Sequence, residues 1–221
     1  MPKNRAAAFI RPILRDARGV SAIEFALIAP VLILLYCGMA ELSSALMAAR
    51  KTDHAISTVG DLVAQTPATP ALPTPTINPS LMANNFQAAV DIMAPYPSTS
   101  GSSSTPILLL RATSLVMQAD NSIQAIWSCT PSGQNGLTPM AKNTVVVPKT
   151  GATTPGGVTI SSLLTNPGDS VIMSEGQYAF TSPVSYFIPN ALNFSNTFYL
   201  KPRQGASIAY ATTGSGASCN G

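Results

Sequence analysis

Few residues in this chain of 221 are of a type and spacing that could perform chemistry. His54 is the single histidine, so a Ser-His-Asp or Cys-His site would have to use it, yet no nucleophile motif such as G-x-S-x-G is present. No Cys or His cluster has zinc spacing, and the glycine stretches TPGG and GSGAS do not open a helix, as a phosphate-binding loop requires. We therefore expect no enzyme, no metal and no cofactor. The acidic residues beyond the first fifty are dispersed: Asp53, Asp61, Asp91, Asp120, Asp169 and Glu175.

Charge is scarce and concentrated at the N-terminus. Charged residues make up 10% of the chain and hydrophobic residues 46%, which is typical of an exported, neutral domain of strands and loops rather than a cytosolic enzyme. The formal net charge of +3 comes from the leader, because five of the twelve basic residues precede Gly19 and the rest of the chain is close to neutral. This distribution gives no support to nucleic-acid binding. The five are Lys3, Arg5, Arg11, Arg15 and Arg18.

The most apolar segment follows this basic leader. Residues 25–40 carry no charge, and the wider span 22–47 holds only Glu24 and Glu41. As a helix this span rises about 39 Å, which is enough to cross a bilayer core of about 30 Å. The excess of basic residues on its N-terminal side predicts a cytoplasmic N-terminus and an exported, periplasmic bulk. A secretory signal peptide is the alternative, but its apolar core would be shorter and would end in a small-x-small cleavage site.

Four parts follow from these patterns: a basic cytoplasmic leader (1–19), a long helix (20–65) whose membrane part is about 22–47, a proline-rich linker (66–78) and an exported domain (79–221). The outer half of the helix is amphipathic. Its apolar positions recur at steps of three and four, with one longer step: Leu42, Leu46, Ala49, Ile56, Val59 and Val63.

The exported domain begins with a short helix and continues as strands. Asn78 is a suitable N-cap and Pro79 suits the first helical position. The apolar positions Leu81, Phe86, Val90 and Met93 can share one face of this helix. The runs 107–118 and 123–129 flank a hairpin signal, and residues 143–148, 157–164, 169–180 and 196–202 are further strand candidates. The run 169–180 alternates, so that Val171, Met173, Glu175 and Gln177 should point to one face and Ile172, Ser174 and Gly176 to the other. We therefore predict an α+β fold in which a long transmembrane helix and a second, short helix accompany an antiparallel sheet of about four to six strands.

Two of the three cysteines can pair. Cys37 lies in the apolar helix, whereas Cys129 and Cys219 lie in the exported part, which is oxidising if the compartment is a bacterial periplasm. A bridge between these two would join the last residues to a strand in the middle of the domain. The alternative is two unrelated thiols.

The segment RGVSAIEFALIAPVLILLYCGMAEL resembles the start of TadE-like proteins, the minor pseudopilins of the tight adherence (Tad/Flp) pilus system. The matching features are a glycine after basic residues, the run from Glu24 to Leu27, Pro30 in the helix, and a Gly-x-x-Glu formed by Gly38 and Glu41. A weaker likeness lies near the C-terminus. It comprises Tyr178, Phe180, Pro183 and Arg203, with Lys201 where the family pattern has arginine.

The resemblance implies a prepilin-type leader. A prepilin peptidase of the inner membrane would cut after Gly19, which leaves Val20 as the new N-terminus and Glu24 as its fifth residue. The implied assembly residues are Glu24, Phe25 and Pro30, and the implied partners are other pilin and pseudopilin subunits and the Tad secretion platform. In a stack of helices the Glu24 carboxylate of one subunit can approach the new amine of its neighbour, which fixes the register.

Interpretations without an assembly role remain open for these residues. Near the cytoplasmic interface, the Glu24 side chain can reach the headgroups at small cost. Pro30 either allows the bending that pilin-type helices tolerate or is one of the prolines common in membrane helices. Glu41 is expected at the outer interface, solvated or paired with Arg50 or Lys51 of a neighbour. The alternative function is an uncleaved, single-pass periplasmic protein with an adhesive or cell-envelope-binding domain. A third class is an anchored periplasmic hydrolase that uses His54 or a pair of carboxylates.

Overall fold

The computed structural model describes residues 20–70, 72–100, 105–147, 163–182 and 190–221. The basic leader, Gly19, Pro183 and most of the strand candidate 157–164 lie outside these residues. The chain divides into two compact units, with the boundary between Ser44 and Ala45.

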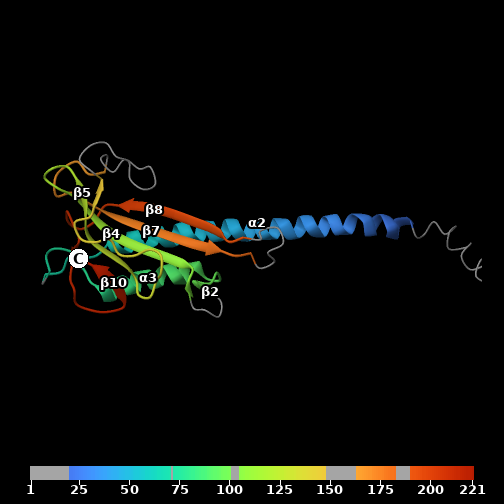
Figure 1. Cartoon of the computed structure of the whole chain (residues 1–221), viewed down its shortest axis with the longest axis horizontal. Coiled ribbons are helices and arrows are strands. Elements are labelled where there is room, and N and C mark those ends of the chain that lie inside the picture. The colour runs from blue at the N-terminus through green and yellow to red at the C-terminus, as the bar shows by residue number, and fades with distance from the viewer. Residues whose placement is uncertain (1–19, 71, 101–104, 148–162, 183–189) are drawn as a thin grey trace, which may run out of the picture. The chain divides into compact units, whose positions relative to one another are not determined.

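A single helix crosses this boundary. Helix α2 runs from Val20 to Ala64 and contains Pro30 without interruption (Figure 1). Since proline has no amide hydrogen, the carbonyl of Ala26 loses its usual partner four residues on. The helix is long and apolar enough to cross a membrane, as the sequence predicts.

The C-terminal unit is built on a six-stranded antiparallel sheet, which confirms the predicted α+β class. The strand order is β10-β5-β4-β7-β8, and β6 pairs with one end of β5. The strands of this sheet are β4 (Leu108–Met117), β5 (Ile123–Pro131), β6 (Val145–Val147), β7 (Ser170–Phe180), β8 (Leu192–Leu200) and β10 (Ala217–Asn220). Short pairs are formed by β2 (Thr99–Ser100) with β3 (Thr105–Pro106) and by β1 (Thr76–Ile77) with β9 (Ala209–Tyr210).

The predicted hairpin joins β4 to β5. The carboxylate of Asp120 accepts hydrogen bonds from the amide and hydroxyl of Ser122, at 3.0 and 2.7 Å. Asn121 takes the left-handed conformation that a tight turn requires, with φ of 63°. The turn thus places two strands of the central sheet side by side from local sequence alone.

Within the C-terminal unit, one face of the sheet packs on the outer part of α2 (Figure 1). β7 alternates as its sequence predicts: Val171 and Met173 lie in the apolar cluster of one face, and Ile172 lies in the cluster that contains the helix. The Ser174 hydroxyl donates to the carbonyl of Ile56 at 2.7 Å. A Cβ on Gly176 would lie 2.4 Å from Cγ1 of Ile56, so the glycine permits this close approach.

The buried stripe of α2 includes the predicted Ile56, Val59 and Val63 but differs from the prediction in the part of the helix before them. Leu42 and Leu46 are 57% and 55% exposed, whereas Ala45 and Ala48 are 4% and 0% exposed. Ala45 and Ala48 belong to the same buried cluster as Ile56, Val59 and Val63. The stripe continues through Thr52, Ala55, Ile56, Val59 and Val63.

Helix α3 (Pro79–Met93) begins as predicted, with the Asn78 side chain accepting from the amide of Leu81 at 2.9 Å. Of its predicted face, Phe86 and Met93 are buried, whereas Leu81 and Val90 are only partly buried. The proline-rich residues before it carry β1, and the carbonyl of Pro75 accepts from the amide of Ala209 at 2.8 Å. The buried face consists of Pro79, Met82, Asn85, Phe86, Ala89 and Met93.

Candidate assembly surface

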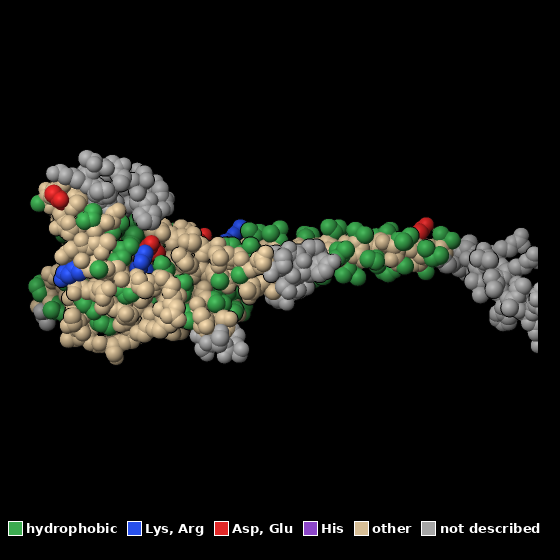
Figure 2. All heavy atoms as spheres, viewed as in Figure 1, with side chains coloured by type: hydrophobic (Ala, Val, Ile, Leu, Met, Phe, Trp, Pro, Cys, Tyr) green, Lys and Arg blue, Asp and Glu red, His purple; other side chains and the backbone are tan. Residues whose placement is uncertain are grey.

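The N-terminal part of α2 exposes its large apolar side chains. Figure 2 shows hydrophobic atoms covering this part of the helix. Leu27 is 72% exposed and Tyr36 is 75% exposed. Contiguous apolar surface of this extent is characteristic of contact with lipid or with another protein, because water solvates it poorly. Exposed on the same segment are Val20, Ile23, Phe25, Ile28, Val31, Leu32, Ile33, Leu34, Leu35 and Met39.

The predicted assembly residues lie at the start of this surface. Val20 is the first residue of α2, and Glu24 lies about one turn further on. The Glu24 side chain is exposed, as is Phe25 at 70%. Pro30 is exposed as well. The structure thus places a carboxylate within about 6 Å of rise from the helix start, on an otherwise apolar surface.

Glu41 is not solvated, contrary to the first of the two alternatives expected for it. Its exposed fraction is 3%, and neither carboxylate oxygen has a hydrogen-bond partner among the described residues. On the helix it occupies the same stripe as Ala45 and Ala48, at steps of four and three. Burial of this acid was not foreseeable from the sequence, where it marks the end of an apolar run.

The weaker C-terminal likeness falls on core and edge positions. Tyr178 and Phe180 are both 2% exposed, and the ring of Tyr96 packs edge-on against Phe180 at 6.2 Å between centroids. Burial raises the pKa of the Tyr178 phenol above 10.0, and Tyr96 contributes in the same direction. Arg203 instead lies at the surface, where its guanidinium pairs with Asp61 of α2 at 2.9 Å. This pair links the segment after β8 to the helix.

Cys129 and Cys219 form a disulfide, the predicted pair. The two residues lie directly opposite each other where β10 pairs with β5. Cys129 is wholly buried and Cys219 is half-buried. The bridge therefore joins the last strand of the chain to the middle of the domain, as expected. Cys37 is a free, half-buried thiol on α2.

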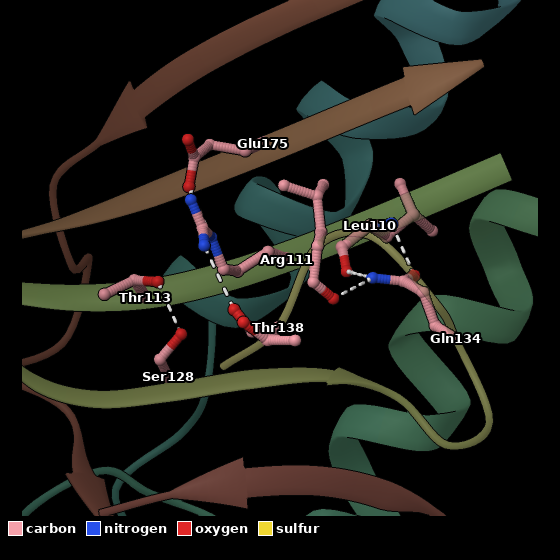
Figure 3. Close-up of polar contacts among 8 residues, drawn as sticks. Leu110, Arg111, Thr113, Ser128, Gln134, Thr138 and Glu175 are labelled. Carbon is pink, nitrogen blue, oxygen red and sulfur yellow. Dashed lines mark hydrogen bonds and ion pairs between the residues drawn. The ribbon is translucent and has the colours of Figure 1, made fainter. Parts of the chain in front are cut away.

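Two polar groups missed in the sequence tie the domain together. The ammonium of Lys51 donates to the carbonyls of Ile92, at 3.0 Å, and of Ala94 at the end of α3. On the sheet, the guanidinium of Arg111 pairs with Glu175 at 2.7 Å and also donates to the carbonyl of Thr138 (Figure 3). These pairings join segments far apart in the chain, so no local pattern predicts them.

A third such group is the side chain of Gln134, whose carboxamide makes the hydrogen bonds that a neighbouring strand's backbone would otherwise make. Its carbonyl accepts from the amide of Leu110 at 2.8 Å, and its amino group donates to the carbonyl of Leu110 at 3.1 Å (Figure 3). The amino group also donates to the carbonyl of Leu137 at 2.7 Å. Because β5 does not extend beside this part of β4, the carboxamide satisfies backbone groups there that would otherwise lack a partner.

His54 lies on the exposed side of α2, and its backbone carbonyl accepts from Ser57 and Thr58. Among the residues described, no three His, Cys, Asp or Glu side chains gather closely enough to hold a metal ion. The polar side chains described above, such as Arg111 and Gln134, thus join strands and loops to one another and do not gather at one site.

Residues 19–60 match the model of a family described as TadE-like protein. This match confirms the resemblance found in the sequence for the segment that carries it. It covers the exposed part of α2 and most of the covered part, but none of the sheet. No curated protein matches the chain, and no solved structure does.

Proposed function

We propose that this chain is a minor pseudopilin, a structural rather than catalytic subunit for assembly of a Tad/Flp-type adhesion pilus. A prepilin peptidase removes residues 1–19 after Gly19, and the mature protein stays in the inner membrane through α2 with its folded domain in the periplasm. From there it joins other pilin and pseudopilin subunits through the secretion platform. The observation that carries the proposal is the exposed apolar surface of α2 within a TadE-like segment.

The chemistry proposed for Glu24 depends on the cut. Cleavage creates an α-ammonium group at Val20 with a pKa of about 7.7–8.0. Within the membrane or a bundle of helices, a charge without a partner is costly. The Glu24 carboxylate of one subunit therefore receives the amine of the next, and a stack shifted out of register leaves both charges unpaired.

Pro30 fits the same proposal. The missing hydrogen bond at Ala26 weakens the helix at one point and allows it to bend when subunits pack. The alternative of a proline with no assembly role predicts that Pro30→Ala assembles normally.

The first experiment determines the N-terminus by mass spectrometry of the purified protein, expressed with and without the cognate peptidase. We expect a chain that begins at Val20 only when the peptidase is present. The Gly19→Leu variant is the control, because a bulky side chain at the cut should block processing. A full-length chain in the peptidase-positive strain would support the uncleaved, single-pass envelope protein instead.

A second experiment isolates the role of the Glu24 charge. Glu24→Gln should remain in the membrane but incorporate into sheared pili at least about tenfold less, since losing one partner of a buried pair costs about 2–5 kcal/mol. Glu24→Asp keeps the charge and should retain most of the incorporation. The double variant Ile23→Glu with Glu24→Gln moves the acid by one position, and normal piliation by this variant would remove the register role.

A further inference from the structure

The exposed side of α2 continues into the C-terminal unit as a short strip, which we call the outer strip: Leu46, Met47, Arg50, Asp53 and His54. Leu46 and Met47 are 55% and 56% exposed. Behind them, Ala48, Thr52 and Ala55 are wholly buried against the domain. Apolar side chains followed by arginine form a composition enriched at protein interfaces.

The two charges of the outer strip are three residues apart but are not paired with each other. No ion pair within 4.0 Å joins Arg50 to Asp53, and the side chain of Arg50 makes no hydrogen bond to any described residue. One oxygen of Asp53 accepts from the side-chain amide of Asn196 on β8 at 2.9 Å. That bond holds the carboxylate in place at the surface and leaves its second oxygen available.

The other charges of α2 in this unit are used within the domain. Lys51 binds two carbonyls of the α3 segment, and Asp61 pairs with Arg203. Arg50 is therefore the cation of this part of α2 that has no partner among the described residues, and it lies beside an acid fixed by a neighbouring strand. If Arg50 were only a solvated surface residue, its charge would need no further explanation. That alternative does not explain why Arg50 lies next to the exposed Leu46 and Met47.

We propose that the outer strip binds a second copy of this chain, with Arg50 of one copy paired to Asp53 of the next. Three residues correspond to about 4.5 Å along a helix. The Val20 amine and Glu24 are four residues apart, or about 6 Å. In both pairs the cation thus lies on the N-terminal side of the acid, and the displacements between parallel copies that the two pairs require differ by about 1.5 Å, which the long side chain of arginine accommodates.

Charge complementarity and this spacing select the occupant. A copy displaced along the helix brings a cation opposite an acid, whereas an undisplaced copy places Arg50 opposite Arg50. The apolar Leu46 and Met47 then lie against the same neighbour, at the separation of about 8–10 Å that packed helices adopt. The inference rests on the proposed function only for the pairing at Glu24.

Cysteine cross-linking in membranes tests the contact in the full chain. Two differently tagged copies carry Arg50→Cys and Asp53→Cys, respectively, with Cys37→Ala in both to remove the free thiol. Mild oxidation, which transfers two electrons from the two thiols to an added oxidant such as copper phenanthroline, should give a mixed dimer. The control pairs Arg50→Cys with Gln65→Cys, which is displaced by about 22 Å and should not cross-link.

Several outcomes would overturn the proposal: no mixed dimer, a dimer formed best by two Arg50→Cys copies, or a product whose mass includes a different protein. Fluorescence of the buried Trp127 that matches that of the unsubstituted chain confirms that each variant is folded. Charge exchange provides an independent measurement. Arg50→Asp and Asp53→Arg should each reduce co-purification of the two tags about two- to fivefold, and the double exchange should restore it. Failure of the double exchange to restore co-purification also contradicts the contact.

The failure of this inference is distinguishable from failure of the proposed function. A chain that begins at Val20 and needs Glu24, but shows no cross-link at 50 and 53, refutes only the contact. A specific cross-link in a chain that keeps its leader refutes the pseudopilin role and leaves the contact between copies in place.

Discussion

The halves of α2 before and after residue 45 belong to one helix but use apolar residues in opposite ways. In the first half, the large side chains from Val20 to Met39 are 48–75% exposed. In the second half, the residues that face the sheet are small or β-branched, and Ala48, Ala55 and Val59 are wholly buried. The difference shows that hydrophobicity alone does not mark the core of this protein.

Packing distance explains the contrast. Gly60 and Gly176 allow the sheet to lie so close to the helix that an added Cβ would meet Leu200 or Ile56 at 2.5 or 2.4 Å. A glycine on one element thus leaves room for a large side chain on the other, as Gly176 does for Ile56. The first half has no such constraint within the chain, so its large side chains remain available to lipid or to other helices.

The largest expected effect comes from one substitution made in both halves. Ile56→Ala should reduce the free energy of unfolding by about 2–5 kcal/mol, because it opens a cavity in the core. Ile28→Ala, at a position 56% exposed, should change it by less than about 0.5 kcal/mol. Denaturant unfolding of the detergent-solubilised full chain, followed by Trp127 fluorescence, measures both. Equal effects at the two positions would mean that the contrast between the halves is wrong.

A smaller effect is expected from the disulfide, which constrains only the C-terminal unit. Replacing Cys129 and Cys219 together by serine removes a link that closes a loop across 90 residues of sequence. The expected loss is about 2–4 kcal/mol in the Trp127 transition.

The helical signal of the exposed half should persist in that double variant after the sheet has unfolded, as circular dichroism at 222 nm can show. Cys37→Ser is the matched control and should leave the transition unchanged. Loss of all helical signal together with the sheet would show that the halves do not unfold separately.

The smallest effect concerns pH. Because the pKa of Tyr178 is raised by burial, the folded protein holds this proton more tightly than the unfolded chain does. The contribution to stability is therefore fully present below pH 10 and declines as the pH rises above it, where the unfolded chain ionises first. Tyr178→Phe should flatten that decline in unfolding measured between pH 9 and about 11. A wild-type decline that persists in the variant would assign the effect to another group.

Much of the local structure was predictable. The Asn78 cap, the turn after Asp120 and the alternation of β7 follow from short-range rules, and each is confirmed. The buried face of α3 was predicted correctly at Phe86 and Met93 but not at Leu81 and Val90, because neighbouring stripes of a helix with 3.6 residues per turn carry similar residues. Contacts such as Lys51 with the end of α3 were not predictable, since partners so far apart leave no mark in a local pattern.

The sequence by itself determined the existence of an apolar N-terminal helix, the acid one turn from Val20, the disulfide pair and an antiparallel domain. Periodicity and composition are properties of short segments, and only two cysteines lie outside the apolar helix. Only the tertiary structure decided which side of α2 is covered. It buried Ala45 and Ala48, left Leu46 exposed and enclosed Glu41. The reason is that a helix offers several similar faces, and which of them is covered depends on the residues that the rest of the domain packs against it.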